Sequence, residues 1–409
     1  MMATEFQHPF DRELLSPKFL RNPYSYYKQL REENPVFWSE RLQAWIITRY
    51  KDVEPALHDP RLSSGKRVTA ILSGLPAKER GQYQQLYDHV TKWLGFSDPP
   101  DHDRLRRLLG KTFTPRMMQA LLPTIQSIVD ELLDAVHGRD EIDIASALAF
   151  PQPLNVILTM IGVPPEDRDK FKQWSNSIGH FVSAGAVTHT RARNAQEAVQ
   201  HLSEYFHELA KQRRREPQDD LLSLFVGLES DGDHLTHDEL ISMCVQLLFA
   251  GHETTEGSMG LGLLALFRNP EQMERLRDNP ELIKSAVEEI LRYDTSVQRQ
   301  ARVLYEDMEI DGHLLRQDQY LLLFIAAANR DPEKFDEPDA FDITRHPNPH
   351  ISFGFGIHYC IGGPLARLEL QVALGSLLER YPHMQLPEQN LEYEELLALR
   401  KLKSLIVRV

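Results

Sequence analysis

Two kinds of hydrophobic pattern alternate along the chain. Short aromatic and β-branched runs at 36–38 and 45–48, separated by a polar stretch, predict an early hairpin. From Lys51 onward, apolar residues recur mostly at helical spacing. The exception is the stretch 301–326, where apolar runs surround Asp311-Gly312, a strong hairpin-turn pair, and predict a second small sheet. The pattern therefore predicts a mainly α protein with a small β part.

The longest helical pattern begins at Thr236, which fits a capping box with Glu239, and stays apolar through Phe267. At 1.5 Å per residue it would span about 45 Å, enough to cross a whole domain. Its middle, residues 250–255 (Ala-Gly-His-Glu-Thr-Thr), interrupts the apolar face. Because a threonine can bond the carbonyl four residues back, we expect Thr254 to open the helix locally and leave room for a ligand or water. Whether His252 faces solvent or a neighbouring element stays open.

A glycine-hinged loop, residues 353–362 (Phe-Gly-Phe-Gly-Ile-His-Tyr-Cys-Ile-Gly), closes on Cys360, one of only two cysteines. The glycines permit backbone conformations in which peptide N–H groups turn toward the sulfur and favour a thiolate of low pKa. Gly362 and Gly363 then open a helix, and Pro364 fits its first turn. Cys360 is therefore expected near the positive end of a helix dipole.

Three chemistries suit a thiolate on such a loop: a nucleophile, a zinc ligand or the axial ligand of a haem. A structural zinc site needs paired ligands at short spacing, and only His358 lies close to Cys360, while Cys244 is far away in sequence. A nucleophile needs a base whose position the sequence does not reveal. The flat apolar and glycine surface of the loop suits a broad planar cofactor better.

Composition limits the class of protein further. At 409 residues and 42% hydrophobic content, length alone suggests about two or three domains, yet no linker, repeat or low-complexity tract divides the chain. Two cysteines argue against a disulfide framework, and no apolar run approaches the roughly 20 residues of a membrane span. The polar start carries no signal peptide or anchor, so a soluble cytoplasmic protein is expected. We also expect the protein to be a monomer. The formal net charge of −14 makes a nucleic-acid partner unexpected.

The cysteine loop resembles the haem-ligand loop of cytochrome P-450 monooxygenases, whose pattern F-x-x-G-x-x-x-C-x-G the chain meets at Phe353, Gly356, Cys360 and Gly362. The resemblance extends over nearly the whole chain and implies one large domain over residues 1–409. It implies the cytochrome P-450 fold, with a long central helix crossing over a buried haem b, and Cys360 as the ligand of the iron.

The interrupted helix resembles the oxygen-binding groove of the same family, A-G-x-[DE]-T-T, with every position matched. The resemblance implies that Ala250 and Gly251 flank the haem. It also implies that Thr254 holds dioxygen and a proton-donating water, and that Glu253 connects this water to bulk solvent. The thiolate of Cys360 would push electron density from the other side of the haem.

Glu289 and Arg292 are i, i+3 partners on one helix face. If the pair is buried it must be fully paired, so a third partner is expected. The pair matches the E-x-x-R motif of the family, whose usual third member corresponds by order and spacing to Arg345. The resemblance gives these three residues a structural role around the haem pocket.

Haem carries two propionates, which a buried site must satisfy with cationic or hydrogen-bonding groups. His102 and Arg106, at i, i+4 of a helix, match the pair that clasps a propionate in bacterial members. Arg302, at the start of a strand, matches another family position. His358, within the cysteine loop, completes the expected set.

The electrons must come from another protein, because the chain shows neither a dinucleotide-binding turn nor an iron–sulfur cysteine set. We expect a ferredoxin or flavodoxin with its reductase, so that NAD(P)H acts only indirectly. A basic stripe can dock such an acidic partner, although an ordinary solvated helix face explains the stripe as well. It consists of Arg104, Arg106, Arg107 and Lys111.

The expected reaction is the insertion of one oxygen atom from dioxygen into a small, largely apolar organic substrate, by hydroxylation or epoxidation. The resemblance places Leu247, Ala250 and Val297 in the substrate pocket, with parts of 65–93 and of the 181–192 loop. Two alternatives are a peroxide-driven oxygenase of the same family, which usually replaces the Glu253-Thr254 pair, and a non-catalytic haem sensor or carrier.

Overall fold

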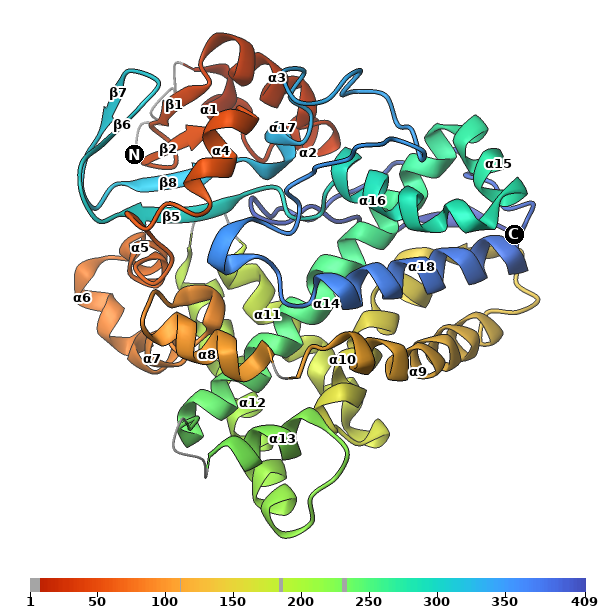
Figure 1. Cartoon of the computed structure of the whole chain (residues 1–409), viewed down its shortest axis with the longest axis horizontal. Helices are drawn as coiled ribbons and strands as arrows, with labels where there is room; N and C mark the ends of the chain where they lie inside the picture. Colours follow the sequence, from red (N-terminus) through yellow and green to blue (C-terminus); the bar gives the residue numbers. More distant parts are fainter. Residues whose placement is uncertain (1–7, 111, 184–186, 230–233) are drawn as a thin grey trace.

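In the computed structural model, the sheet lies toward one end of the molecule and the helices form the rest (Figure 1). The structure describes residues 8–409 except 111, 184–186 and 230–233. Within this part of the chain, none of the helices combines the length and the apolar character that crossing a membrane requires.

A five-stranded sheet has the strand order β1-β2-β8-β5-β3. Its members are β1 (Val36–Ser39), β2 (Ala44–Ile47), β8 (Tyr320–Leu323), β5 (Gln300–Leu304) and β3 (Leu62–Ser63). β1 and β2 form the predicted antiparallel hairpin. The prediction of a second sheet is wrong for β5 and β8, because β8 pairs parallel with β2, with Ala44 opposite Tyr320. Apolar periodicity identifies a strand but not its partner.

The turn at Asp311-Gly312 forms as predicted, with φ of +52° and +76°. It joins β6 (Met308–Ile310) to β7 (His313–Leu315), which make a separate two-stranded ribbon. A third small sheet pairs β4 (Glu141–Asp143) with β9 (Ile406–Arg408) near the end of the chain. The sequence analysis did not predict this last pair.

The described α-helices range from one turn to 32 residues. They are α1 (Pro9–Glu13), α2 (Pro17–Arg21), α3 (Tyr24–Glu33), α4 (Tyr50–Ala56), α5 (Arg67–Ser73), α6 (Ala77–Arg80), α7 (Gln84–Val90), α8 (Asp101–Gly110), α9 (Pro115–Asp134), α10 (Pro151–Ile161), α11 (Arg168–Val182), α12 (His189–Arg215), α13 (Leu221–Leu228), α14 (His237–Arg268), α15 (Pro270–Asp278), α16 (Ile283–Tyr293), α17 (Ile325–Ala328) and α18 (Gly363–Arg380).

Helix α14 is the long helix predicted from the apolar run, and it crosses the centre of the molecule (Figure 1). The capping box is present: Thr236 Oγ1 accepts from the Glu239 amide at 3.2 Å, and the Thr236 amide donates to the Glu239 carboxylate at 2.8 Å. Most of its side chains are buried on all sides, because α10, α12, α16 and α18 pack around it. A helix buried all round has no amphipathic stripe, so any polar residue in its middle needs a partner within the protein.

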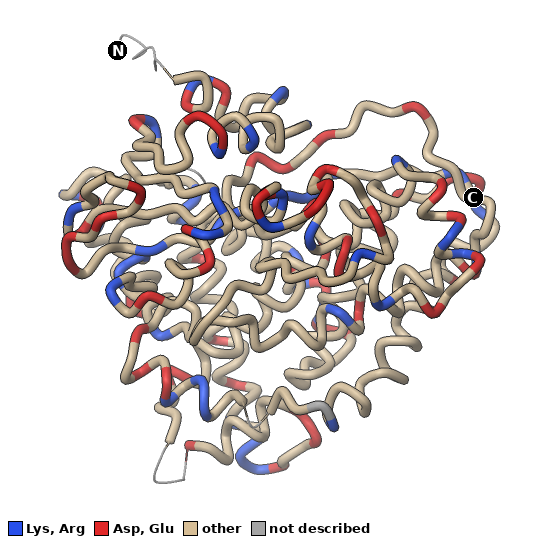
Figure 2. The backbone as a smooth tube through the Cα atoms, turned by 45° about the horizontal axis from the view of Figure 1, so that its top comes forward, with Lys and Arg blue, Asp and Glu red and all other residues tan. Residues whose placement is uncertain are grey.

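Charged residues of both signs are interspersed along the outer segments in the view of Figure 2. The buried residues form four apolar clusters, two of them among the helices and two beside the five-stranded sheet. The net negative charge is therefore not gathered into one acidic face in this view.

Candidate active site

The loop before α18 adopts its shape through glycines in the left-handed region. Gly354 and Gly356 have φ of +72° and +68°. A β-carbon at Gly356 would lie 2.4 Å from the Cβ of His58, so this position also needs the missing side chain. The Cys360 amide donates to the Phe353 carbonyl at 2.9 Å, which closes the loop. Gly362 caps α18 and Pro364 follows in the first turn, as predicted.

The Cys360 sulfur faces a cavity and is exposed to it, although protein surrounds the cavity. Burial raises the pKa of the thiol, and the amides of Gly362 and Gly363 and the charge of Arg106 lower it only in part. The net shift is upward, so the prediction of a low-pKa thiolate is wrong for the polypeptide alone. Two backbone amides and the charges of Arg106 and Arg367 do not offset desolvation, whereas direct bonding to a metal cation would.

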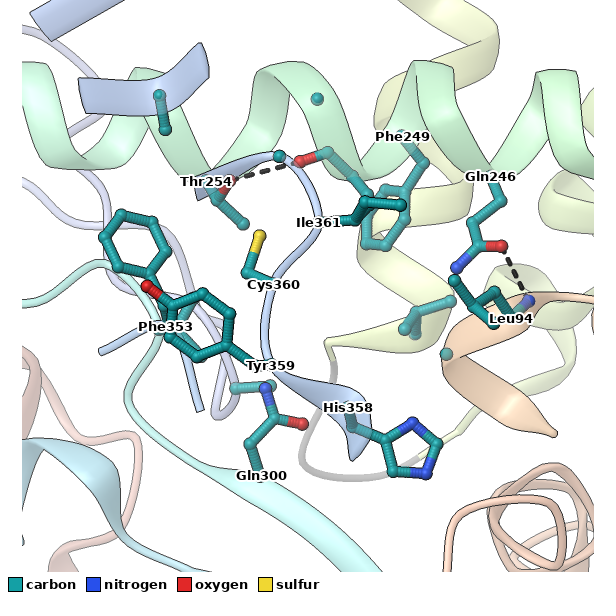
Figure 3. A pocket seen from close by; sticks show the side chains of 18 of the residues that line it. Leu94, Gln246, Phe249, Thr254, Gln300, Phe353, His358, Tyr359, Cys360 and Ile361 are labelled. Atoms are coloured by element: carbon teal, nitrogen blue, oxygen red, sulfur yellow. Dashed lines mark hydrogen bonds between the residues drawn. The ribbon is translucent and has the colours of Figure 1, made fainter. Parts of the chain in front are cut away.

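The opposite wall of the cavity belongs to α14. Figure 3 shows the sulfur of Cys360 pointing toward the turn that carries Thr254. The Thr254 hydroxyl donates to the Ala250 carbonyl at 3.1 Å, as the sequence predicts. The predicted local opening of the helix is wrong, because α14 is continuous from His237 to Arg268. Ala250 and Gly251 also line the cavity. Gly251 brings α14 close to α10, since a β-carbon there would lie 3.0 Å from Ile157.

Glu253 does not line the cavity. Its carboxylate is 1% exposed and pairs with Lys401 Nζ at 2.7 Å. Lys401 also contacts Glu256 at 3.0 Å, so one cation from the end of the chain joins two acids of α14. Burial alone would raise the pKa of Glu253, but the bond with His252 and the charge of Lys401 outweigh it and lower the pKa to about 2. His252 itself is fully buried and faces Ser175 of α11 at 3.3 Å.

Lys401→Met is expected to lower the free energy of unfolding by about 3–5 kcal/mol, because it leaves two buried acids without their cation. The lowered pKa of Glu253 gives stability that is present above its ordinary value of 4.5 and is lost as the pH falls toward about 2. In the variant the pKa of Glu253 should rise, so acid unfolding should begin at higher pH. Urea titrations at neutral and acidic pH measure both effects.

Lys403→Met is the matched control, because Lys403 is 43% exposed and lies 3.8 Å from Glu392. Its free energy of unfolding should change by less than about 1 kcal/mol. Equal effects of the two substitutions would contradict the assignment of Lys401 as the partner of the buried acids.

The four residues expected to hold propionates all line the cavity: His102, Arg106, Arg302 and His358. The rings of His102 and His358 lie 4.4 Å apart. Burial and the charges of Arg302, His102, Arg67 and Arg106 lower the pKa of His358 to about 2, so its imidazole is neutral. The structure therefore brings together residues from α8, β5 and the cysteine loop as one positively charged wall.

Sequence reasoning missed several polar residues of the cavity and its surroundings. Arg67 and Arg299 line the cavity, as does Glu369 of α18, whose pKa burial raises well above its ordinary value. Lys401 lies behind the α14 wall. Arg67 falls in the stretch predicted to face substrate, which is the one signal that marked it. Arg299 and Lys401 belong to irregular segments, where periodicity says nothing about direction.

The residues of the cavity fit a flat cofactor with two carboxylates. Four arginines are among the described lining residues, and the one carboxyl group among them, Glu369, is held neutral. The buried Nε2 of His102 and Nε of Arg299 have no protein partner. A buried cationic wall without protein anions demands an anionic ligand. Arg106, Arg302, His102 and His358 would hold the propionates of a haem, and Cys360 would ligate its iron.

A buried ionic network supports the loop from behind. Glu289 and Arg292 of α16 are both fully buried and paired at 2.8 Å, and Arg345 Nε lies 3.3 Å from Glu289. Arg292 also donates to three backbone carbonyls, those of Asn329, Pro338 and Ala340. The expected third partner is therefore in place, and the network ties α16 to the irregular segment that leads to Cys360.

The basic stripe on α8 does not form a single exposed face. Arg104 pairs with Glu239 and donates to the His234 carbonyl at 3.0 Å. Arg106 turns into the cavity, and Lys111 lies outside the described residues. The hypothesis of one docking stripe is thus wrong for Arg104, which pairs with Glu239 of α14, and for Arg106, which lines the cavity instead of an exposed face.

The space above Cys360 has a volume of about 340 Å³. Leu247, Ala250 and Val297 line it, as the resemblance implies, together with Ile71, Leu94 and Leu399. The predicted substrate-facing stretch 65–93 contains the short helices α5, α6 and α7, and α5 contributes to the wall. Of the predicted 181–192 loop, Val182 and Ser183 line the cavity, while 184–186 lie outside the described residues.

Fold and cavity together define a class of protein that encloses a planar dianionic cofactor between a cysteine loop and a long helix. Residues 19–406 match the family model of cytochrome P450. The chain belongs to the cytochrome P450 family.

Its relatives are bacterial. The biotin biosynthesis cytochrome P450 of Bacillus subtilis (strain 168) is 41% identical over 400 residues, covering 96% of this chain and 97% of that protein. The vitamin D(3) 25-hydroxylase of Pseudonocardia autotrophica is 39% identical over 404 residues, covering 97% and 96%. The crystal structure of P450BioI in complex with hexadec-9Z-enoic acid ligated acyl carrier protein has a TM-score of 0.89 and 39% identity, over 96% of this chain and 100% of that chain.

Membership of the family gives the cofactor and the type of reaction. The protein is a monooxygenase that binds haem b and uses dioxygen as co-substrate. NAD(P)H supplies its electrons indirectly, through redox partners. The mainly helical cytochrome P-450 fold predicted from the sequence is confirmed.

Proposed function

We propose that this monooxygenase inserts one oxygen atom into a small, largely apolar organic substrate held between α14, α5 and the start of β5, by hydroxylation or epoxidation. The observation that carries the proposal is the juxtaposition of the Cys360 sulfur, the Thr254 turn and an apolar cavity ringed by unmatched cations. The test is incubation with a reductase and ferredoxin under isotopically labelled dioxygen. One labelled oxygen in the product supports the proposal, and oxygen from water contradicts it.

When bound, haem supplies the activation of dioxygen and the oxidising power, which no amino-acid side chain provides. The chain's own residues do the rest. Cys360 binds the iron and donates electron density. Thr254 holds a proton-donating water in the cavity, using the hydroxyl that now bonds the Ala250 carbonyl. Apolar side chains, Leu247 and Val297 among them, orient substrate and exclude bulk water.

Glu253 can take part in proton delivery only after its ion pair with Lys401 has opened. Paired with Lys401 and shielded from the cavity, it cannot pass a proton to the Thr254 side. Delivery requires the carboxylate to leave Lys401 and turn toward the groove, so the ion pair acts as a gate. Gly179 leaves room beside it, since a β-carbon there would lie 2.9 Å from the Glu253 carboxylate.

The remaining parts of the proposal concern partners. Electrons come from a ferredoxin or flavodoxin with its reductase. The protein acts as a cytoplasmic monomer with one cytochrome P-450 domain.

Because one structural relative carries its fatty acid on an acyl carrier protein, a carrier-bound substrate is a second source to compare with free compounds. A peroxide-driven reaction is a weaker alternative, since Glu253 and Thr254 are both present.

Thr254→Ala is expected to divert reducing equivalents into hydrogen peroxide. Product formed per NAD(P)H consumed should fall at least roughly tenfold, because the group that positions the proton donor is gone. Peroxide and product are measured in the same reaction. A non-catalytic haem carrier would show no such change.

Thr91→Ala is the matched control. Thr91 makes the same bond to the carbonyl four residues back, at 3.0 Å to Tyr87, but is not among the described cavity residues. Unchanged coupling in Thr254→Ala, or an equal loss in Thr91→Ala, would contradict the assignment.

A further inference from the structure

Two arginines of the cavity lie outside the set that the propionates require. Arg67 begins α5 and stacks on Phe96, with its guanidinium carbon 4.0 Å from the ring centre. Its Nε donates to the Ser64 carbonyl at 3.1 Å, and it also donates to the Gly95 carbonyl. These neutral acceptors orient the guanidinium but leave its charge unmatched.

Arg299 lies just before β5 and is 8% exposed. Its Nε has no partner, and its side chain hydrogen-bonds Tyr320 of β8. A buried guanidinium whose donors are not all satisfied costs free energy unless a ligand completes them. Arg67, Arg299 and Tyr320 all line the same cavity. We refer to these three residues as the second cationic group.

The charges do not balance with haem alone. Two propionates would be matched by Arg106 and Arg302, with His102 and His358 as hydrogen-bonding neighbours, all four of which line the cavity. Burial, together with the nearby charge of Arg299, lowers the pKa of Arg67 to about 10. The second cationic group therefore leaves two permanent charges in a largely apolar space without a propionate to pair with them.

Asp98 is a protein carboxylate whose charge acts on Arg67, and it is already engaged by other donors. It accepts from Ser63 Oγ at 2.5 Å, from the amides of Ser64 and Gly65 at 2.8 and 3.0 Å, and from Tyr305 at 2.9 Å. Asp98 is also absent from the described lining of the cavity. It reduces the field at Arg67 but does not fill the space in front of the arginines.

The second cationic group is continuous with the apolar wall. Arg67 and Ile71 are i, i+4 neighbours on α5, and both line the cavity. Arg299 follows Val297 by two residues along the same segment. A ligand that reaches both arginines therefore also contacts Ile71, Leu247 and Val297. Such a ligand must therefore carry an anionic group at one end of a long apolar chain.

We propose that Arg67, Arg299 and Tyr320 bind the carboxylate of a free fatty-acid-type substrate, whose chain then runs along Ile71 and Val297 toward the Thr254 turn. This inference rests on the proposed function and names its substrate class. The depth of Arg299 favours a carboxylate inside the cavity over the phosphate of a carrier-protein arm, which is attached to a surface and stays near it. The carbon that is oxidised along the acyl chain is then set by the distance from the anchored carboxylate to the oxidising centre.

The test compares a fatty acid with its methyl ester of the same chain length, using the spin-state change of the haem in the purified holoenzyme to obtain Kd. The native protein should bind the acid at least roughly tenfold more tightly than the ester, as expected for charge-assisted hydrogen bonds. Arg67→Met and Arg299→Met should each remove this preference and leave the Kd of the ester unchanged. Tyr320→Phe, a milder change, should reduce the preference in part.

Arg316→Met is the control, because Arg316 is 62% exposed and pairs with Asp307 at the surface. It should keep the full preference for the acid. Equal affinity of the native protein for acid and ester overturns the inference, and so does a preference that survives in both arginine variants. If those variants lost haem faster and kept the preference for the acid, the arginines would bind the haem propionates and not the substrate. A separate outcome concerns the proposed function: it would be overturned if the reduced carbon-monoxide complex of the native protein lacked the long-wavelength Soret band of cysteine ligation.

Discussion

Replacing Cys360 by serine is expected to abolish the long-wavelength Soret band of the reduced carbon-monoxide complex. That band requires a thiolate bound to the iron, and a serine oxygen does not supply the same electron donation. Product formation with the redox partners should be lost together with the band, because the donated density is what favours cleavage of the O–O bond. The absorption spectrum of the carbon-monoxide complex is the measurement.

Cys244→Ala provides the matched control, since Cys244 is the second cysteine of the chain and is buried in α14. Burial raises the pKa of its thiol, so it stays protonated. The control variant should retain the band in full. A band that persists in Cys360→Ser, or disappears in Cys244→Ala, would mean that Cys360 is not the ligand.

The second large effect is expected at Glu289. Glu289→Gln leaves Arg292 fully buried without its counter-charge and weakens the bond to Arg345. The loss in the free energy of unfolding should be about 3–5 kcal/mol, a large share of the roughly 5–15 kcal/mol typical of whole domains. Much of the purified protein should lack haem, because the network supports the segment that leads to Cys360. Denaturant titration and haem content measure the two effects.

Glu333→Gln removes one member of an exposed pair, Lys51 with Glu333, in which the side chains are 55% and 62% exposed. Its effect should be below about 1 kcal/mol, with normal haem content. If Glu289→Gln behaved like this surface variant, the role of the buried network in holding the pocket would be refuted.

The local features of the site were predictable because each has a short-range cause. Thr236 and Glu239 mark the start of α14 through a capping box, and Gly354 and Gly356 mark the bend before Cys360. The i, i+3 spacing of Glu289 and Arg292 predicts an ion pair within one helix. In each case the residues that interact are close in sequence, so the pattern contains the whole interaction.

The features that the sequence did not predict depend on contacts between distant segments. Lys401 reaches Glu253 across 148 residues, and no periodic pattern connects them. The parallel pairing of β2 with β8 likewise depends on tertiary packing, as does the turn of Arg104 toward Glu239. The upward pKa of Cys360 shows the same limit, because desolvation is a property of the assembled cavity.

The joining of β2 to β8, and of the chain's end to its beginning, has a consequence for biosynthesis. Arg400 donates to the Leu20 carbonyl across 380 residues, and Lys401 completes the surroundings of Glu253. The sheet beside the cavity cannot form until β8 has left the ribosome, and Glu253 and Glu256 of α14 lack their cation until Lys401 has been made. Contacts between residues so distant in sequence form late. Haem capture should therefore follow synthesis of the segment that holds Arg400 and Lys401, and a variant without residues 400–409 should retain helices but lose cofactor.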